Sequence, residues 1–152
     1  MAAINVFSCN VRGLGEQHKR RDVIHFLKNN KCDILMLQDT HLTQEKTSSF
    51  NSLWNGKAYH SCFKNNSRGT SILFNKNIQH EVINTFTDKK GNFIILECKI
   101  STDTYILGSF YGPNRDEPDF YERIGNILDS TDYDHVIIGG DFNFVVNPDV
   151  DC

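Results

Sequence analysis

The chain has 152 residues, which is enough for one domain with a buried core. Apolar residues make up 39% and charged residues 23%, as in folded globular proteins, so the composition excludes a disordered chain. The 16 basic and 19 acidic residues give a net charge of −3, which argues against a protein whose whole surface binds nucleic acid. A metal-dependent nuclease is not excluded, because bound divalent cations would reverse the field of a carboxylate cluster.

The cysteines indicate a reducing compartment. Their number is odd and no CxxC pair occurs, so we expect neither a disulfide framework nor a zinc site. No secretory signal is visible at the start, and no apolar stretch approaches the ~18 residues of a membrane span. We therefore expect an intracellular protein, nuclear or cytoplasmic, that does not associate with membranes.

The first third of the chain predicts a strand, a helix, a strand and a second helix, at residues 4–11, 16–30, 33–38 and 43–54. In the first strand, Ile4, Val6, Ser8 and Asn10 share one face. The strand at 33–38 is almost continuously apolar, so we expect it to be central and covered on both faces.

Two local features of the helices support these assignments. In the first helix, Val23, Ile24 and Leu27 form the apolar stripe, while the basic run Lys19–Arg21 is interpreted as a solvated face or, less simply, as a phosphate contact. Thr43 is expected to cap the second helix.

The middle of the chain predicts consecutive strands in an antiparallel meander, at residues 59–63, 71–74, 81–86, 93–100 and 104–110. A helix is expected at 118–129, followed by a short buried strand that begins near Val136. Two glycines, Gly139 and Gly140, end that strand.

Polar side chains follow four of the apolar strands. The four clusters are Ser8–Leu14, Leu37–Leu42, Tyr111–Asn114 and Gly139–Asn143. Ligands bind at strand ends in open α/β sheets, so the clusters suggest one shared site. In isolation, the last cluster is equally compatible with an Asx turn that closes a strand.

The order and spacing of these clusters resemble the exonuclease–endonuclease–phosphatase superfamily, and in detail the apurinic-endonuclease-like domain of LINE (non-LTR) retrotransposons. The Gln38–Leu42 and Gly139–Asn143 blocks are the most specific parts. The resemblance implies an α/β fold, a four-layer αββα sandwich, of which we expect residues 1–152 to form the N-terminal part as a single, C-terminally incomplete domain. It also implies DNA as substrate, nicking of one strand, and Mg²⁺ or Mn²⁺ as cofactor.

The resemblance also implies roles for individual residues. Asn10 would order the metal-binding carboxylate and the phosphate, and Asp39 stands at the position of a metal-binding glutamate. Tyr111 would contact the scissile phosphate, Asp141 would orient or deprotonate the attacking water, and Asn143 would hydrogen-bond the phosphate. Further substrate contacts are assigned to Arg12, Asn114 and Arg115. His41 is interpreted as structural and not as a ligand.

Two departures from the family pattern predict impaired catalysis. Asp39 is one methylene shorter than glutamate, so its carboxylate retreats by ~1.5 Å, whereas Mg²⁺ needs contacts of ~2.0–2.1 Å. The family's Asp-His pair, expected beyond this chain, has no counterpart here. The isolated chain is therefore expected to be inactive or severely impaired as a nuclease.

An incomplete sandwich would also expose apolar surface and strand edges, so we expect the chain to form a homodimer or to bind a protein partner. Two alternatives to a DNA-nicking domain remain open. One is an exapted, non-catalytic binding or assembly module. The other is a phosphatase of the same superfamily that acts on a small phosphoester.

Overall fold

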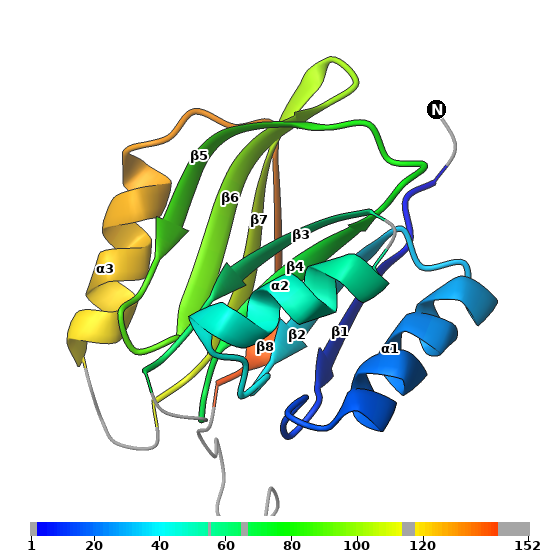
Figure 1. Ribbon diagram of the computed structural model, residues 1–152. Helices are drawn as coiled ribbons and strands as arrows, with labels where there is room; N and C mark the ends of the chain where they lie inside the picture. The colour runs from blue at the N-terminus through cyan, green and yellow to red at the C-terminus, as the bar shows by residue number, and fades with distance from the viewer. Residues whose placement is uncertain (1–2, 55, 65–66, 114–117, 143–152) are drawn as a thin grey trace, which may run out of the picture.

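Two four-stranded sheets pack face to face in the computed structural model, which describes residues 3–54, 56–64, 67–113 and 118–142. The first sheet has the order β1-β2-β4-β3 and the second β5-β6-β7-β8. Helices α1 and α2 lie outside the first sheet and α3 outside the second, which confirms the expected αββα sandwich (Figure 1). The helices are α1 (Gln17–Asn29), α2 (Gln44–Leu53) and α3 (Pro118–Asp129). The strands are β1 (Val6–Asn10), β2 (Ile34–Gln38), β3 (Gly56–Ser61), β4 (Thr70–Asn75), β5 (Glu81–Thr87), β6 (Phe93–Ile100), β7 (Asp103–Tyr111) and β8 (His135–Asp141).

In the first sheet, β2 is the central strand that its apolar sequence predicts. It pairs in parallel with β1 and antiparallel with β4, and all five of its residues are buried. Its outer face packs under α1 and α2, where Leu27 and Phe50 are almost completely buried. The N-cap of α2 is also confirmed, because the Thr43 side chain accepts a hydrogen bond from Lys46 N at 3.4 Å.

In the second sheet, β5, β6 and β7 form an antiparallel meander and β8 joins β7 in parallel. A single five-stranded meander was the wrong prediction, since β3 and β4 belong to the first sheet and the chain crosses between sheets after β4. Alternating apolar residues mark each strand as half-buried, but they do not tell which of two sheets buries it.

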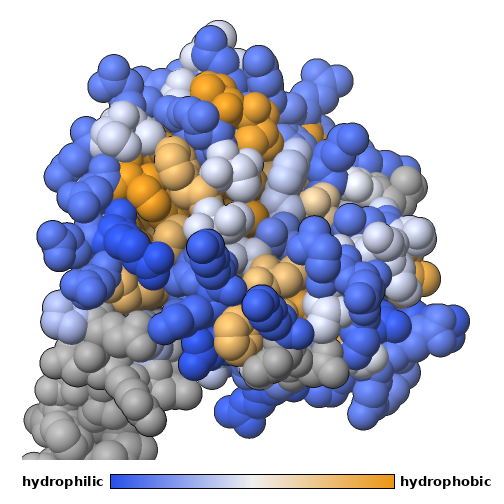
Figure 2. Space-filling view, turned by 60° about the vertical axis from the view of Figure 1, so that its left-hand side comes forward, coloured by the Kyte–Doolittle hydropathy of each residue, from blue (hydrophilic) through white to orange (hydrophobic). Residues whose placement is uncertain are grey.

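The core has three layers of apolar side chains. The central layer, between the sheets, contains Met36 and Phe74 from the first sheet and Leu96 and Leu107 from the second. A second layer lies under α1 and α2, and a third lies between α3 and the outer face of the second sheet. Apolar atoms remain visible among hydrophilic ones on the side turned forward in Figure 2.

The basic run at the start of α1 is not uniformly solvated. Arg20 is only 9% exposed, and its Nη1 donates to the carbonyl oxygens of Leu14 and Gly15 at 2.9 and 3.0 Å. Arg20 therefore holds the loop that follows β1, which corrects the interpretation of this residue as part of a solvated face. Within the described residues, no helix is long and apolar enough to cross a membrane.

Strand β8 approaches the first sheet closely at Gly139. A Cβ atom there would lie 2.7 Å from Ser8 Oγ, 2.8 Å from Ser8 Cβ and 3.0 Å from Met36 Sδ. Only a residue without a side chain fits between β8 and the first sheet at this point. The glycine therefore allows the ends of β1 and β8 to meet.

We predict that Gly139→Ala destabilises the fold by about 1–3 kcal/mol, because the added methyl group overpacks the inter-sheet space. Urea denaturation measures the free energy of unfolding. Gly125→Ala is the matched control: it lies in α3 and its Cβ would meet nothing within 4 Å. The control is expected to be neutral or to stabilise by up to ~1 kcal/mol. Equal effects of the two substitutions would contradict the close approach.

His60 on β3 is enclosed between β4 and α2. Its Nδ1 lies 2.7 Å from Ser71 Oγ and its Nε2 lies 2.9 Å from Asn51 Oδ1. A neutral ring satisfies both partners by accepting from the hydroxyl and donating to the amide oxygen. Burial lowers the pKa of His60 from 6.5 to about 4, so the ring stays uncharged in the folded protein near neutral pH.

We therefore predict that His60 makes the fold acid-sensitive. The unfolded chain takes up the proton near pH 6.5 and the folded chain only near pH 4, so stability is lost as the pH falls through this window. The loss amounts to about 3 kcal/mol in total. Denaturation at pH 7, 6, 5 and 4 should show a shallower decline for His60→Gln, which keeps a donor and an acceptor but does not titrate. Parallel declines in both proteins would contradict the assignment.

Candidate functional site

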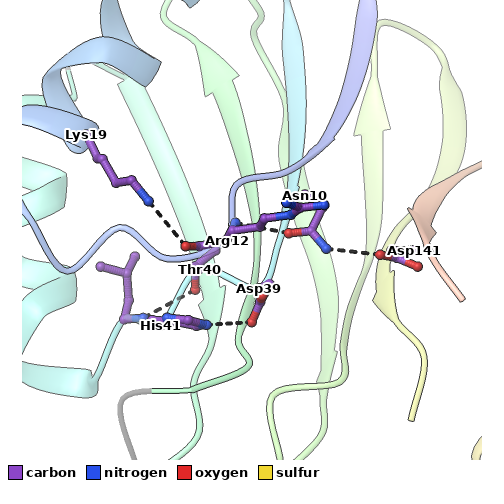
Figure 3. A network of polar contacts seen from close by, with 8 residues as sticks. Asn10, Arg12, Lys19, Asp39, Thr40, His41 and Asp141 are labelled. Carbon is purple, nitrogen blue, oxygen red and sulfur yellow. Dashed lines mark hydrogen bonds and ion pairs between the residues drawn. The ribbon is translucent and has the colours of Figure 1, made fainter. Parts of the chain in front are cut away.

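The ends of four strands meet at one edge of the sandwich. Asn10 ends β1 and Asp39 follows β2, while Tyr111 and Asp141 end the paired strands β7 and β8. Asn10 Nδ2 donates to Asp141 Oδ2 at 3.0 Å, so the contact joins the two sheets (Figure 3). The structure thus brings these four strand ends to one edge, and their function as one site stays a prediction.

A buried polar group lies directly below this contact, between the sheets. Gln38 is 1% exposed, and its Nε2 donates to Ser8 Oγ at 3.0 Å and to Ser109 Oγ at 3.1 Å. Ser109 Oγ donates in turn to the Leu37 carbonyl at 2.9 Å. Buried polar groups are costly unless they are paired, so this network favours one alignment of the sheets.

Asn10 and Arg12 form the next part of the site. Asn10 Oδ1 accepts from the backbone N–H of Arg12 at 3.0 Å, and Arg12 has a positive φ of 49°. Lys19 Nζ donates to the Arg12 carbonyl at 3.3 Å. The amide of Asn10 is therefore fixed at both ends, while the side chain of Arg12 is exposed at the rim.

Asp39 is held by a neighbour two residues along the chain. Its Oδ1 lies 2.7 Å from His41 Nε2, and both residues have a φ of 57° (Figure 3). The Asp39 carbonyl accepts from Gly13 N at 2.7 Å, and His41 N donates to the Arg68 carbonyl at 2.7 Å. The backbone around the Asp39 carboxylate is thus tied to two other loops.

Tyr111 and Asp141 are register partners in β7 and β8, so their side chains share the face that looks toward the first sheet. Gly112 N donates to the Asp141 carbonyl at 2.6 Å, and Tyr111 N donates to the Asn92 carbonyl at 2.7 Å. These bonds fix the end of β7 beside Asp141. The other predicted site residues, Asn114, Arg115 and Asn143, lie outside the described residues.

Sequence reasoning missed two parts of the site. It assigned His41 a structural role without identifying Asp39 and Gly13 as its neighbours, and it did not identify the contacts of Gln38. The signal for Gln38 was present, because a buried strand that ends in an amide requires a polar partner. The partner of His41 depends on a left-handed turn at Asp39, which no sequence pattern here indicates.

The side chains at this edge could supply some of the ligands of a Mg²⁺ ion, but not a complete coordination shell. Among the described residues, no three His, Cys, Asp or Glu side chains cluster as a metal site. Mg²⁺ commonly binds to one or two carboxylates and completes its shell with waters and substrate phosphate. Asp39 is the carboxylate and Asn10 the amide that would hold such an ion.

A model of the endonuclease/exonuclease/phosphatase family matches residues 2–150. The chain belongs to this family. A curated relative, the "Transposon TX1 uncharacterized 149 kDa protein" of Xenopus laevis, is 28% identical over 148 residues, which are 95% of this chain and 11% of the relative.

Solved structures share the fold of this family member at low sequence identity. The endonuclease domain of TRAS1, a telomere-specific non-LTR retrotransposon, aligns with a TM-score of 0.65 at 14% identity, over 93% of this chain and 59% of that one. D. rerio TDP2, in complex with a single-stranded DNA product, aligns with a TM-score of 0.68 at 16% identity, over 93% and 61%. The mannosyl-6-phosphatase Bt3783 of Bacteroides thetaiotaomicron aligns with a TM-score of 0.67 at 11% identity, over 93% and 66%. The chain thus spans roughly three fifths to two thirds of these structures.

Proposed function

We propose that this chain is the metal-dependent DNA-nicking part of a non-LTR-retrotransposon-type endonuclease. The observation that carries the proposal is the 3.0 Å hydrogen bond from Asn10 to Asp141, with Asp39 and Tyr111 at the same edge of the sandwich. This arrangement brings a carboxylate that can accept a proton next to groups that can bind a phosphate. Hydrolysis of a phosphodiester needs both.

Each residue has a role in the proposed reaction. Asp141 orients the attacking water and takes its proton, while Asn10 holds Asp141 Oδ2 in place. Tyr111 and Asn143 contact the scissile phosphate, and substrate is held at the rim by Arg12, Asn114 and Arg115. A bound divalent cation, Mg²⁺ or Mn²⁺ held by Asp39 and Asn10, would polarise the phosphoryl group and offset its developing charge.

DNA is the proposed substrate because the similar proteins include transposon products. The TX1 transposon relative and the TRAS1 endonuclease domain both come from mobile elements. The mannosyl-6-phosphatase has the same fold, so the fold by itself does not separate a nuclease from a phosphatase. Hydrolysis of small phosphoesters without nicking would favour the phosphatase.

We expect weak metal binding by Asp39 to be one cause of the impaired activity of the isolated chain. We predict that Asp39→Glu tightens Mg²⁺ binding about tenfold, which corresponds to roughly 1.4 kcal/mol, and raises nicking of supercoiled plasmid. Asp141→Ala should reduce the nicking rate by about 10²–10⁴-fold. Asp132→Asn, an exposed acid on the loop before β8, is the control. Nicking that persists in Asp141→Ala would contradict the proposal.

A second candidate function is that of a non-catalytic assembly module. Exposed apolar residues and strand edges on one side of the molecule favour it. Within the described residues, β1 and β8 each pair with a single neighbour, and the two strands contact each other. Val136 and Ile138 on β8 are 39% and 43% exposed, so the prediction that this strand is buried was wrong. Next to β1, a groove of about 530 Å³ is lined by residues that include Phe7 and Phe26. We propose that a second copy of the chain covers this side.

Light scattering after size-exclusion chromatography tests the dimer. We predict that the wild-type chain elutes as a dimer and that the double substitution Val136→Lys, Ile138→Lys yields a folded monomer, because two charges cannot be buried unpaired. Ile83→Lys is the matched control, since Ile83 is 48% exposed on β5 at the opposite edge of the second sheet. A wild-type monomer would contradict the dimer and leave the nuclease proposal intact.

We also propose an intracellular location, nuclear or cytoplasmic. Cys9, Cys32, Cys62 and Cys98 are all free. Burial raises the pKa of the Cys32 and Cys98 thiols to about 11, so both stay protonated and unreactive. Free thiols of this kind are compatible with a reducing compartment.

A further inference from the structure

We infer that His41 is a positioning residue that fixes the Asp39 carboxylate for metal binding. The inference rests on the proposed function and assigns to His41 a task beyond the structural role expected from the sequence. His41 Nε2 lies 2.7 Å from Asp39 Oδ1, which is a short, charge-assisted distance for a nitrogen and a carboxylate oxygen. The pair is partly shielded, with side-chain exposures of 33% for His41 and 17% for Asp39.

The other side of the ring is fixed by a glycine. Gly13 has a φ of 97°, and a Cβ atom there would lie 2.7 Å from His41 Nδ1. The ring therefore occupies the space that a side chain at this position would need. Nε2 contacts Asp39, and Nδ1 lies on the side of the ring that faces Gly13. This geometry favours a positioning role over general-base catalysis.

The backbone makes the pair rigid. Asp39 and His41 both adopt a left-handed conformation, at a φ of 57°, which costs an L-residue roughly 1 kcal/mol or more. Hydrogen bonds from Gly13 N to the Asp39 carbonyl and from His41 N to the Arg68 carbonyl hold these conformations. The Asp39 carboxylate is therefore held in place by the backbone conformation of Asp39 and by the ring of His41.

A fixed carboxylate is an advantage for a metal ligand such as Asp39, whose side chain is one methylene shorter than that of glutamate. A ligating carboxylate normally uses one oxygen for the metal and has its other oxygen hydrogen-bonded by a neighbouring residue. His41 occupies Oδ1 of Asp39 and leaves Oδ2 for a cation. Fixing the carboxylate removes the entropy that a mobile side chain would lose on binding. His41 thus partly offsets the weak metal binding expected from the shorter side chain of Asp39.

Manganese titrations of the whole chain, followed by paramagnetic broadening of the Asn10 and Asp141 amide signals, test this inference without any measurement of activity. We expect His41→Ala to weaken Mn²⁺ binding by about 10–100-fold, as for other residues that hold a ligating carboxylate. His41→Gln should restore much of the loss, because its amide N–H can reach the same oxygen. His18→Ala, a histidine whose side chain is 69% exposed, is the control and should bind as wild type.

The outcomes separate this inference from the proposed function. Mn²⁺ binding by His41→Ala that equals or exceeds that of wild type overturns the inference, even if the variant melts at a lower temperature. His41-dependent binding without any plasmid nicking, even by the Asp39→Glu variant, upholds the inference and overturns the nuclease proposal. A wild-type chain that binds no Mn²⁺ overturns both. Gly13→Ala, which crowds the ring, should weaken binding in the same direction as His41→Ala.

Discussion

The candidate site depends on how closely β1 and β8 approach each other. Asn10 can donate to Asp141 only because Gly139, two residues before Asp141, brings β8 against Ser8 of β1. Gln38 then ties both sheets together through hydroxyl groups in an otherwise apolar layer. The apolar core would tolerate several alignments of the sheets, but the buried amide has partners in one of them. The polar network therefore determines where the strand ends meet.

The sequence predicted most of the elements because their signals are local. The helix at 118–129 and the strand at 93–100 were placed correctly, since a proline start and alternating apolar residues are properties of the segment itself. The division of the middle strands between two sheets was missed because it depends on the crossover after β4, which leaves no local pattern. Arg20 was misjudged for a similar reason, because its carbonyl partners belong to a preceding loop.

The sequence indicated which residues lie together at the candidate site, but not which contacts they make. Asn10, Asp39, Tyr111 and Asp141 were singled out from the motifs, and the structure brings their strand ends to one edge. The restraint on Asp39 was not predictable, because it arises from left-handed turns at Asp39 and His41 and from the space at Gly13. Strained residues often lie at functional sites, where they hold side chains that would otherwise move. In the proposed site, the short side chain of Asp39 is best understood together with this restraint.

Among the described strands, β1 and β8 lie at the edges of their sheets, and this position has a thermodynamic consequence. The hydrogen bond between Asn10 and Asp141 lies where β1 and β8 contact each other. This line of contact, the seam, runs along one side of the molecule. Any chain that binds across this side would favour conformations in which the seam is closed. If association strengthens the binding of phosphate or cation at the site, then by linkage the bound phosphate or cation would strengthen association by the same free energy. In the proposed dimer, association and occupancy of the site would therefore favour the same arrangement of β1 and β8, in which Asn10 donates a hydrogen bond to Asp141.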